Sequence, residues 1–413
     1  MIRPSGQVSV SFAALFAALI VLGGCEVSVN QHELKGSGKT ATEVRTVSAF
    51  DSVSNVTPFN VVVTAEGASR VEITGDDNLL AEVETIVEGN TLLLRNKRKG
   101  AIRFSWNHAP VTIKITAPAI NKISNSGSGD MRLSQLHGDK LLLSLDGSGD
   151  IQASGTVGEA KVKAHGSGNL DLAQLHATTF TLEQNGSGNV HVNGITQSLE
   201  ANINGSGDLE ADGLQLDRAT LNVNGSGSAT LNGVIKSLTA ELSGSGDLFV
   251  DRLQADQANF TLNSSGEMRL AGEVRQLIVT ANGSGDLDAS TLQVGSAVIK
   301  NFGSANMSFK TISSSLKAEL SGSGDLDARL ASAEQIDLVL NGPGSTTLDG
   351  SAKNLTAMLG GSGDLHASSL ILAHASVKVT GAGEAAVNVK STGGLNPATS
   401  SRIVRVDRSG VVQ

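Results

Sequence analysis

The feature that most constrains the fold of this chain is a short glycine-rich turn that recurs at counted intervals. Gly-Ser-Gly or a close variant begins at positions 127, 147, 166, 186, 205, 225, 244, 264, 283, 303, 322, 342, 361 and 381. The successive differences alternate between 20 and 19 without exception, so the true unit has 39 residues and contains two similar coils. Periods of this size are typical of solenoids, in which each coil buries its apolar face on its neighbours.

The residues between turns predict strands. After one turn the chain reads Asp208-Leu209-Glu210-Ala211, and before the next turn Ala219, Leu221 and Val223 share one face. An alternation with period two indicates a strand, and no segment between turns has room for a helix.

Stacking the coils in register places one apolar position of each coil in an inward ladder. In the 20-residue coils this ladder contains Leu209, Leu248, Leu287 and Leu326. We therefore expect an all-β fold, a single-stranded parallel β-helix, right-handed because parallel crossover connections almost always are. Thirteen intervals of about 4.8 Å make a rod of roughly 60 Å. A β-propeller is the alternative, although its four-stranded blades do not require units with near-identical halves.

The turn is predicted to be structural. Glycine occupies its first and third positions except at Ser264 and Ala305, and we expect these glycines to adopt backbone angles that other residues enter only at a cost. The middle serine is replaced at Pro343 and Ala382, and no histidine recurs with it, so no catalytic residue is predicted. The turns singled out as structural are Gly205, Gly207, Gly244, Gly246, Gly283 and Gly285.

The N-terminus has the order of a bacterial lipoprotein signal. Arg3 precedes an apolar stretch over residues 8–22 and then Leu22-Gly23-Gly24-Cys25, which resembles a lipobox. The only cysteine is thus predicted to be the lipidated first residue of an exported protein, anchored to a membrane and by preference to the outer membrane.

The remaining organisation follows from the repeat. We expect a lipoprotein signal peptide over 1–24, a lipidated N-terminus and polar tether over 25–44, irregular first coils or a cap over 45–125, the regular β-helix over 126–392, and a tail or cap over 393–413. Removal of residues 1–24 takes away Arg3 and changes the formal charge from −9 to −10. Nucleic acid is excluded as a partner because phosphate contacts need a basic stripe.

Several motifs resemble the head GIN domain family. They are Phe50-Asp51-Ser52-Val53, Phe59-Asn60-Val61-Val62-Val63, Glu88-Gly89-Asn90-Thr91-Leu92, Ile115-Thr116-Ala117-Pro118 and Ser126-Gly127-Ser128-Gly129-Asp130. The resemblance covers about residues 45–390. It implies a parallel β-helix in an exported bacterial protein, often a lipoprotein, of a family described as autotransporter adhesins whose function is poorly defined.

Acidic residues follow most turns and face outward. The predicted ligand-facing stripe consists of Asp208, Glu210, Asp247, Asp286, Asp288, Asp325 and Asp327. Three interpretations stay open: a solvated face, a Ca²⁺-binding stripe, and a saccharide-binding or saccharide-cleaving face. The Ca²⁺ β-roll pattern is absent, and we expect the array to lack an aromatic platform for sugars because it has no tyrosine and Trp106 lies outside it.

Two further columns were considered. Asparagine recurs before the turn at Asn185, Asn204, Asn224, Asn263, Asn282 and Asn341, which predicts amides that hydrogen-bond from coil to coil. No zinc-ligand spacing of histidines is found, since His191 and His366 are several coils apart, so no metal residue and no cofactor other than Ca²⁺ is predicted.

Two functions fit these observations. The first is a non-enzymatic, lipid-anchored envelope protein that acts as an adhesin or binds a polymer such as a polysaccharide, peptidoglycan or a cell-surface ligand. The alternative is a carbohydrate-active enzyme, a lyase or hydrolase, that uses Asp208, Glu210, Asp247, Asp286 and Asp288 as its acids.

Overall fold

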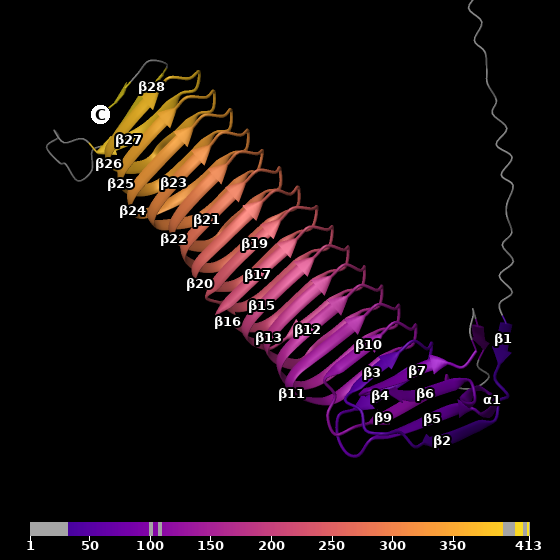
Figure 1. Ribbon diagram of the computed structural model, residues 1–413. Helices are drawn as coiled ribbons and strands as arrows, with labels where there is room; N and C mark the ends of the chain where they lie inside the picture. Colours follow the sequence, from indigo (N-terminus) through magenta and orange to yellow (C-terminus); the bar gives the residue numbers. More distant parts are fainter. Residues whose placement is uncertain (1–31, 99–101, 106–109, 391–400, 408–410, 413) are drawn as a thin grey trace, which may run out of the picture.

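The computed structural model describes residues 32–98, 102–105, 110–390, 401–407 and 411–412. These residues form a long rod of stacked parallel strands with a broader N-terminal end (Figure 1). We call the described residues of 32–125 the head and residues 126–390 the array. The signal peptide over 1–24 and Cys25 lie outside the described residues.

In the array, most coils form one nearly continuous strand between two glycine-rich turns, and the others are split in two. The strands are β11 (Met131–Leu145), β12 (Ile151–Ala164), β13 (Leu170–Gln184), β14 (Val190–Asn193), β15 (Ile195–Ile203), β16 (Leu209–Leu216), β17 (Arg218–Val223), β18 (Ala229–Ile235), β19 (Ser237–Leu242), β20 (Leu248–Leu262), β21 (Met268–Ala281), β22 (Leu287–Asn301), β23 (Met307–Leu320), β24 (Leu326–Leu340), β25 (Thr346–Leu359), β26 (Leu365–Val379) and β27 (Ala385–Lys390).

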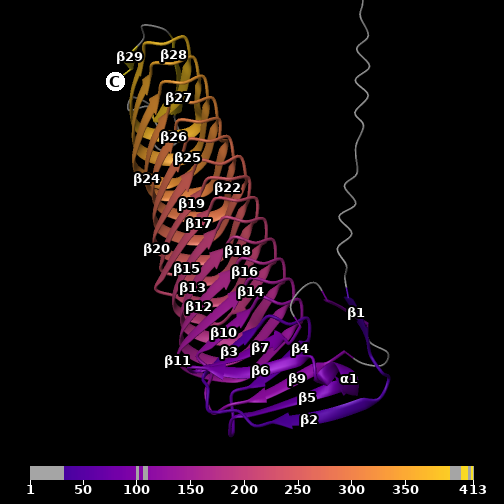
Figure 2. The same cartoon turned by 45° about the vertical axis from the view of Figure 1, so that its right-hand side comes forward.

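Each coil pairs in parallel with the next, as Figure 2 shows along the length of the rod. Leu248 pairs with Met268 and Met268 with Leu287, and all three are at most 2% exposed. The predicted inward ladder is therefore confirmed, and so is the parallel β-helix of 20- and 19-residue coils. Burial of one apolar face per coil supplies the main stabilisation, at about 25 cal/mol per Å².

The turn glycines are required for a different reason from the one predicted. None of the six singled out in the sequence has a left-handed backbone angle. A Cβ atom added at any of them would lie 1.9 to 2.1 Å from a carbonyl oxygen of the preceding coil, as with Gly244 against Gly225. The expectation of strained angles was wrong, because close stacking of backbone on backbone is what excludes a side chain.

The strained angles occur instead at a second bend in many coils. Gly213, Gly272 and Arg252 have φ of 59°, 126° and 57°. The parallel register shifts at the same place, for example between Val250 and Leu253. This bend was not predicted, although glycines outside the counted frame mark several of its positions.

The head combines parallel and antiparallel pairing. Its elements are β1 (His32–Lys35), β2 (Thr40–Arg45), β3 (Ser52–Asn55), β4 (Asn60–Thr64), β5 (Arg70–Asp76), α1 (Asp77–Leu80), β6 (Val83–Glu88), β7 (Thr91–Asn96), β8 (Ile102–Ser105), β9 (Thr112–Thr116) and β10 (Lys122–Asn125). Strands β3 and β4 continue the parallel stack of the array, whereas β5 pairs antiparallel with β2 and β9, and β6 with β7. The head thus ends the stack with strands that reverse its direction.

The segment predicted as a polar tether is structured in its second half. Strand β1 pairs with β8, and β2 pairs with β5 along its whole length. Between them, the Ser37 amide donates to Asn78 Oδ1 at 2.8 Å and its hydroxyl to Asp77 Oδ1 at 2.5 Å. The prediction of a tether was wrong for residues 32–44, because strands β1 and β2 in this segment pair with strands of the head.

At the other end, β28 (Ser401–Val406) pairs antiparallel with β27, and β29 (Val411–Val412) with β26. The described residues of the segment predicted as a tail or cap over 393–413 therefore pair with the last coils. Among the described residues, no helix has the length and apolar character that crossing a bilayer requires.

Candidate functional site

The candidate site is the outward face that follows the glycine-rich turns. All seven acids of the predicted stripe are exposed or half-buried, so they face outward as expected. The strand register divides them into two columns. The first column directly follows the turns and contains Asp208, Asp247, Asp286 and Asp325, and the second lies two residues on and contains Glu210, Asp288 and Asp327.

The first column forms a ladder of hydrogen bonds from side chain to backbone. In twelve of its thirteen steps, a side-chain oxygen accepts from the backbone N–H of the equivalent residue in the next coil, with N···O distances of 2.7 to 3.3 Å. The acceptors are Asp130, Asp150, Asn169, Asn189, Asp208, Ser228, Asp247, Asp286, Asn306, Asp325, Ser345 and Asp364.

This ladder explains why the position after the turn is Asp, Asn or Ser in twelve of the fourteen coils. Each of these side chains is short enough to place an oxygen over the next backbone amide, which would otherwise lack an acceptor. The acidic character of the first column is thus partly a structural requirement. The sequence contained this signal, because Asp, Asn and Ser share an acceptor oxygen but not a charge.

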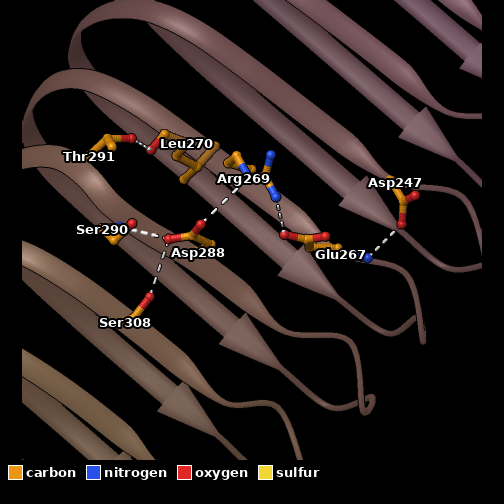
Figure 3. A network of polar contacts seen from close by, with 8 residues as sticks. All are labelled: Asp247, Glu267, Arg269, Leu270, Asp288, Ser290, Thr291 and Ser308. Carbon is orange, nitrogen blue, oxygen red and sulfur yellow. Dashed lines mark hydrogen bonds and ion pairs between the residues drawn. The ribbon is translucent and has the colours of Figure 1, made fainter.

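Within the described part of the chain, the only step without such a bond leads from Glu267 to Asp286. The longer Glu267 side chain instead contacts Arg269, with Nη2 and Oε1 3.0 Å apart (Figure 3). Arg269 also reaches Asp288, with Nε and Oδ2 3.5 Å apart, and lies over the ring of Phe249 at 5.6 Å. An irregular polar cluster therefore occupies the face at this coil.

Asp288 is the most strongly held acid of this cluster. Hydrogen bonds from the side chain and backbone of Ser290, with further contributions from Ser308 and Arg269, keep the pKa of its carboxyl below the usual value. Its Oδ1 lies 2.9 Å from the Ser290 amide nitrogen and 3.3 Å from Ser308 Oγ. A carboxyl held in its ionised form suits binding and is a poor proton donor.

Two shallow grooves run between the columns. One is lined by Asp286, Asp288 and Asp327 together with Glu267 and Ser308. The other lies near the head and is lined by Asp130, Asp150 and Asp171 among others. Asp208 lies three coils from Glu267, the nearest acid of the first groove, about 14 Å along the rod, so the acids proposed for an enzyme do not form one cluster.

Sequence reasoning missed one aromatic side chain in the second column. Phe249 is half-buried and follows Asp247 by two residues, so the array has a partly exposed aromatic ring on this face. The expectation that an aromatic platform is missing was based on tyrosine and tryptophan alone. It is corrected by this ring, which the alternation after Asp247 places outside.

A cluster with metal-binding groups was also missed. Ligand atoms of His191, Glu210 and Asp212 all lie within 4.8 Å of one another. The search for zinc spacing considered only pairs of histidines, whereas these residues are neighbours because their separations of 19 and 21 residues are close to one coil. That spacing is the signal that finds them.

The column before the turn behaves as predicted over part of its length. Asn204 donates to Asn185 at 2.9 Å, Asn224 to Asn204 at 3.0 Å, and Asn282 to Asn263 at 2.8 Å. These coil-to-coil amide bonds confirm a structural ladder, which is interrupted where Ser243 and Phe302 replace asparagine.

Comparison with known proteins links most of the chain to one family. The family model described as "Putative auto-transporter adhesin, head GIN domain" matches four times, over residues 49–173, 154–252, 245–329 and 303–404. No curated protein matches the chain.

Comparison with solved structures finds proteins similar to this chain at low sequence identity. A "putative adhesin" from Bacteroides fragilis is 22% identical, covers 62% of this chain and 99% of its own, and has a TM-score of 0.40. A "putative adhesin" from Parabacteroides merdae is 17% identical with coverages of 77% and 100%, and a "Putative lipid binding protein" from Parabacteroides distasonis is 20% identical with the same coverages; both have a TM-score of 0.25.

Proposed function

Because the chain belongs to the head GIN domain family of "putative auto-transporter adhesins", we propose that it is an exported envelope protein that binds a repetitive polymer along its acidic face. The polymer classes that fit are hydroxyl-rich: a polysaccharide, the glycan strands of peptidoglycan, or a glycan on another cell surface. Binding rather than catalysis is the proposed activity.

The observation that carries this proposal is the unbroken register of the outward columns. A ladder bond to an aspartate uses one carboxylate oxygen, and among the described contacts the second oxygen of Asp208, Asp247 and Asp325 has no partner. Acids on alternate coils therefore offer acceptor oxygens about every 10 Å along the rod. Many weak contacts at a regular spacing give high avidity for a ligand that is itself repetitive.

Binding can be tested by sedimentation with insoluble peptidoglycan and by a glycan array. The triple variant Asp286→Ala, Asp288→Ala and Asp327→Ala removes three of the four acids of one groove and should weaken retention at least about tenfold, because several contacts are lost together. Retention equal to that of the unaltered protein would contradict the use of this face.

A matched control removes the same charge elsewhere. Asp217, Asp256 and Glu334 form ion pairs with basic side chains outside the two acidic columns. Their replacement by alanine should leave polymer retention unchanged. Equal weakening by both triple variants would show that only net charge matters.

Lipid anchoring through Cys25 is part of the proposal and is tested separately. Cys25→Ser should move the protein from the membrane fraction to a soluble fraction. Protease treatment of intact cells, with lysed cells as control, distinguishes the outer surface from the periplasmic side. Persistent membrane association of Cys25→Ser would contradict the anchor and leave the polymer test unaffected.

Incubation with bacterial and plant polysaccharides tests the absence of catalysis. We expect no new reducing or unsaturated ends. Their appearance, and their loss in the triple variant at Asp286, Asp288 and Asp327, would favour the carbohydrate-active enzyme instead.

A further inference from the structure

The cluster of His191, Glu210 and Asp212 is set apart from the other acids of the array by its donor types. His191 and Glu210 are register partners in neighbouring coils, and Asp212 lies two residues after Glu210 on the same outward side of β16. The arrangement places one imidazole and two carboxylates within 4.8 Å of one another. This is a metal-ligand set drawn from two coils.

The Asp212 carboxylate is oriented toward the histidine. Its Oδ1 accepts a hydrogen bond from Asn232 Nδ2 at 3.1 Å, and Asn232 Oδ1 in turn accepts from Arg252 Nε at 2.8 Å. Its Oδ2 lies 3.5 Å from His191 Nε2. Partners of this kind fix the direction of a ligating carboxylate and raise metal affinity.

The Glu210 carboxylate is available. Among the described residues it has no hydrogen-bond or ion-pair partner, and it is exposed. Asp171 lies in the same column two coils before Glu210, and both of its carboxylate oxygens already accept hydrogen bonds. Oδ1 accepts from the Ala173 amide and Oδ2 from Gln152 Nε2. Two carboxylates that form no contact with lysine or arginine therefore face one imidazole, and together they balance the charge of a divalent cation.

A second histidine gives a useful contrast. His165 also lies between two acids, with Nδ1 3.4 Å from Asp146 and Nε2 3.6 Å from Glu183. Each ring nitrogen of His165 thus has its own carboxylate. Among the described residues, only His191 has two carboxylates whose ligand atoms lie, together with its own, within 4.8 Å of one another.

We propose that His191, Glu210 and Asp212 bind a Zn²⁺ ion that bridges two coils of the array. Zinc takes imidazole nitrogen and carboxylate oxygen at about 2.0–2.2 Å, which places tetrahedral ligand atoms about 3.4 Å apart. The ligand atoms lie within 4.8 Å of one another, so the side chains must move closer to bind an ion, and the exposed Glu210 is the one with most freedom to do so. The fourth position is open to water or to a donor from a bound partner. Calcium fits less well because it requires six to eight oxygen ligands.

Calorimetric titration of the full chain in detergent with Zn²⁺ tests the site. We expect one saturable site per chain, weakened about 100-fold or more in His191→Ala and about 10- to 100-fold in Glu210→Gln, Asp212→Asn and Asn232→Ala. Co²⁺ in place of Zn²⁺ should give a visible absorption band that His191→Ala abolishes.

Two matched variants complete the experiment. His165→Ala removes a histidine with two acidic neighbours, and Asp251→Asn alters the residue that follows Asn232 in the column of Asp212. Both should bind Zn²⁺ as the unaltered chain does. Each variant should keep the metal-free melting temperature, since the three ligands are surface residues.

Three outcomes would overturn the proposal: no saturable Zn²⁺ binding, equal weakening by His165→Ala and His191→Ala, or Ca²⁺ displacing Zn²⁺ at equal concentration. The test is independent of polymer binding, so it stands or fails on its own.

Discussion

The head and the array both bury apolar side chains between stacked strands, but they are stabilised by different kinds of contact. In the array, every coil contacts an almost identical coil, so one small set of interactions is repeated: an inward ladder, a crowded glycine turn and an acceptor oxygen over the next amide. In the head, each contact is made once. Phe59 packs edge-on against Phe104 with ring centres 4.9 Å apart, and antiparallel strands reverse the chain direction.

This difference determines which contacts can be recognised from the sequence. A repeated contact is encoded by a period, so it is visible in the spacing of residues. A contact made once is encoded by particular side chains in one place, and their partners are distant in sequence, as for Phe59 and Phe104. The following predictions separate the two regions.

The largest effect is expected from a core truncation in the head. Phe59 is completely buried, and Phe59→Ala should cost about 4 kcal/mol in the free energy of unfolding. Because the coils of a solenoid interact mainly with their nearest neighbours, hydrogen exchange should rise in the head and adjacent coils and not in β24 to β26. A uniform rise along the whole rod would contradict this division.

A glycine substitution should distinguish crowding from strain. Gly244→Ala places a Cβ 1.9 Å from a backbone oxygen and should cost about 3 kcal/mol. Gly67→Ala in the head meets no atom within 4 Å but has a φ of 80°, and should cost about 1–2 kcal/mol. Thermal unfolding of both variants measures the difference, and equal costs would mean that stacking does not crowd the turn.

The ladder of the first column is tested by Asp325. Asp325→Ala removes the oxygen that accepts from the Ser345 amide at 2.7 Å and should lower the free energy of unfolding by about 1 kcal/mol. Asp325→Asn keeps an acceptor oxygen and should lower it by only about 0.3 kcal/mol. Glu267→Ala is the control, because among the described bonds the Glu267 side chain accepts no ladder bond, and its backbone N–H keeps its bond to Asp247 in the variant; it should stay within about 0.5 kcal/mol. A large loss in the control would indicate an effect of charge rather than of the ladder.

The smallest effect is expected in the dependence of stability on pH below about pH 4, where the Asp288 carboxyl becomes protonated. The folded-state pKa of Asp288 is lowered, chiefly by Ser290, so its contribution to stability is present above the unfolded pKa near 4 and is lost as the pH falls through the folded value. Asp288→Asn should flatten the pH dependence below about pH 4 by no more than about 0.5 kcal/mol, since solvent screens the site.

Asp77 in the head provides the comparison for this titration. Its pKa is lowered in the same direction by the hydrogen bond from Ser37. Asp77→Asn should flatten the same acidic limb of the stability curve. Denaturant titrations from pH 2 to 7 measure both variants, and a change confined to neutral pH would contradict the assignment.

The period predicted the fold of the array well. The 20- and 19-residue spacing led to the parallel coils, the buried position of Leu287 and the amide bonds between Asn204 and Asn224. These contacts follow from translation by one coil, which a sequence displays directly.

Other features depend on geometry that the spacing does not contain. The acceptor role of Asp325 requires knowledge of which amide lies above it, and the antiparallel partner of β2 lies about 30 residues away in a segment without a repeat. The cluster at His191 was overlooked because its members differ in type and occur once. The spacing of a repeat does not predict contacts that occur only once.

The 39-residue unit also sets how such a protein changes in length. Insertion or deletion of one complete unit preserves every coil-to-coil contact and alters the rod by two coils, about 10 Å, while both ends keep their antiparallel strands. An insertion that is not a whole number of coils would displace each turn glycine from the backbone it approaches. The length of the rod can therefore change in evolution only in steps of complete coils.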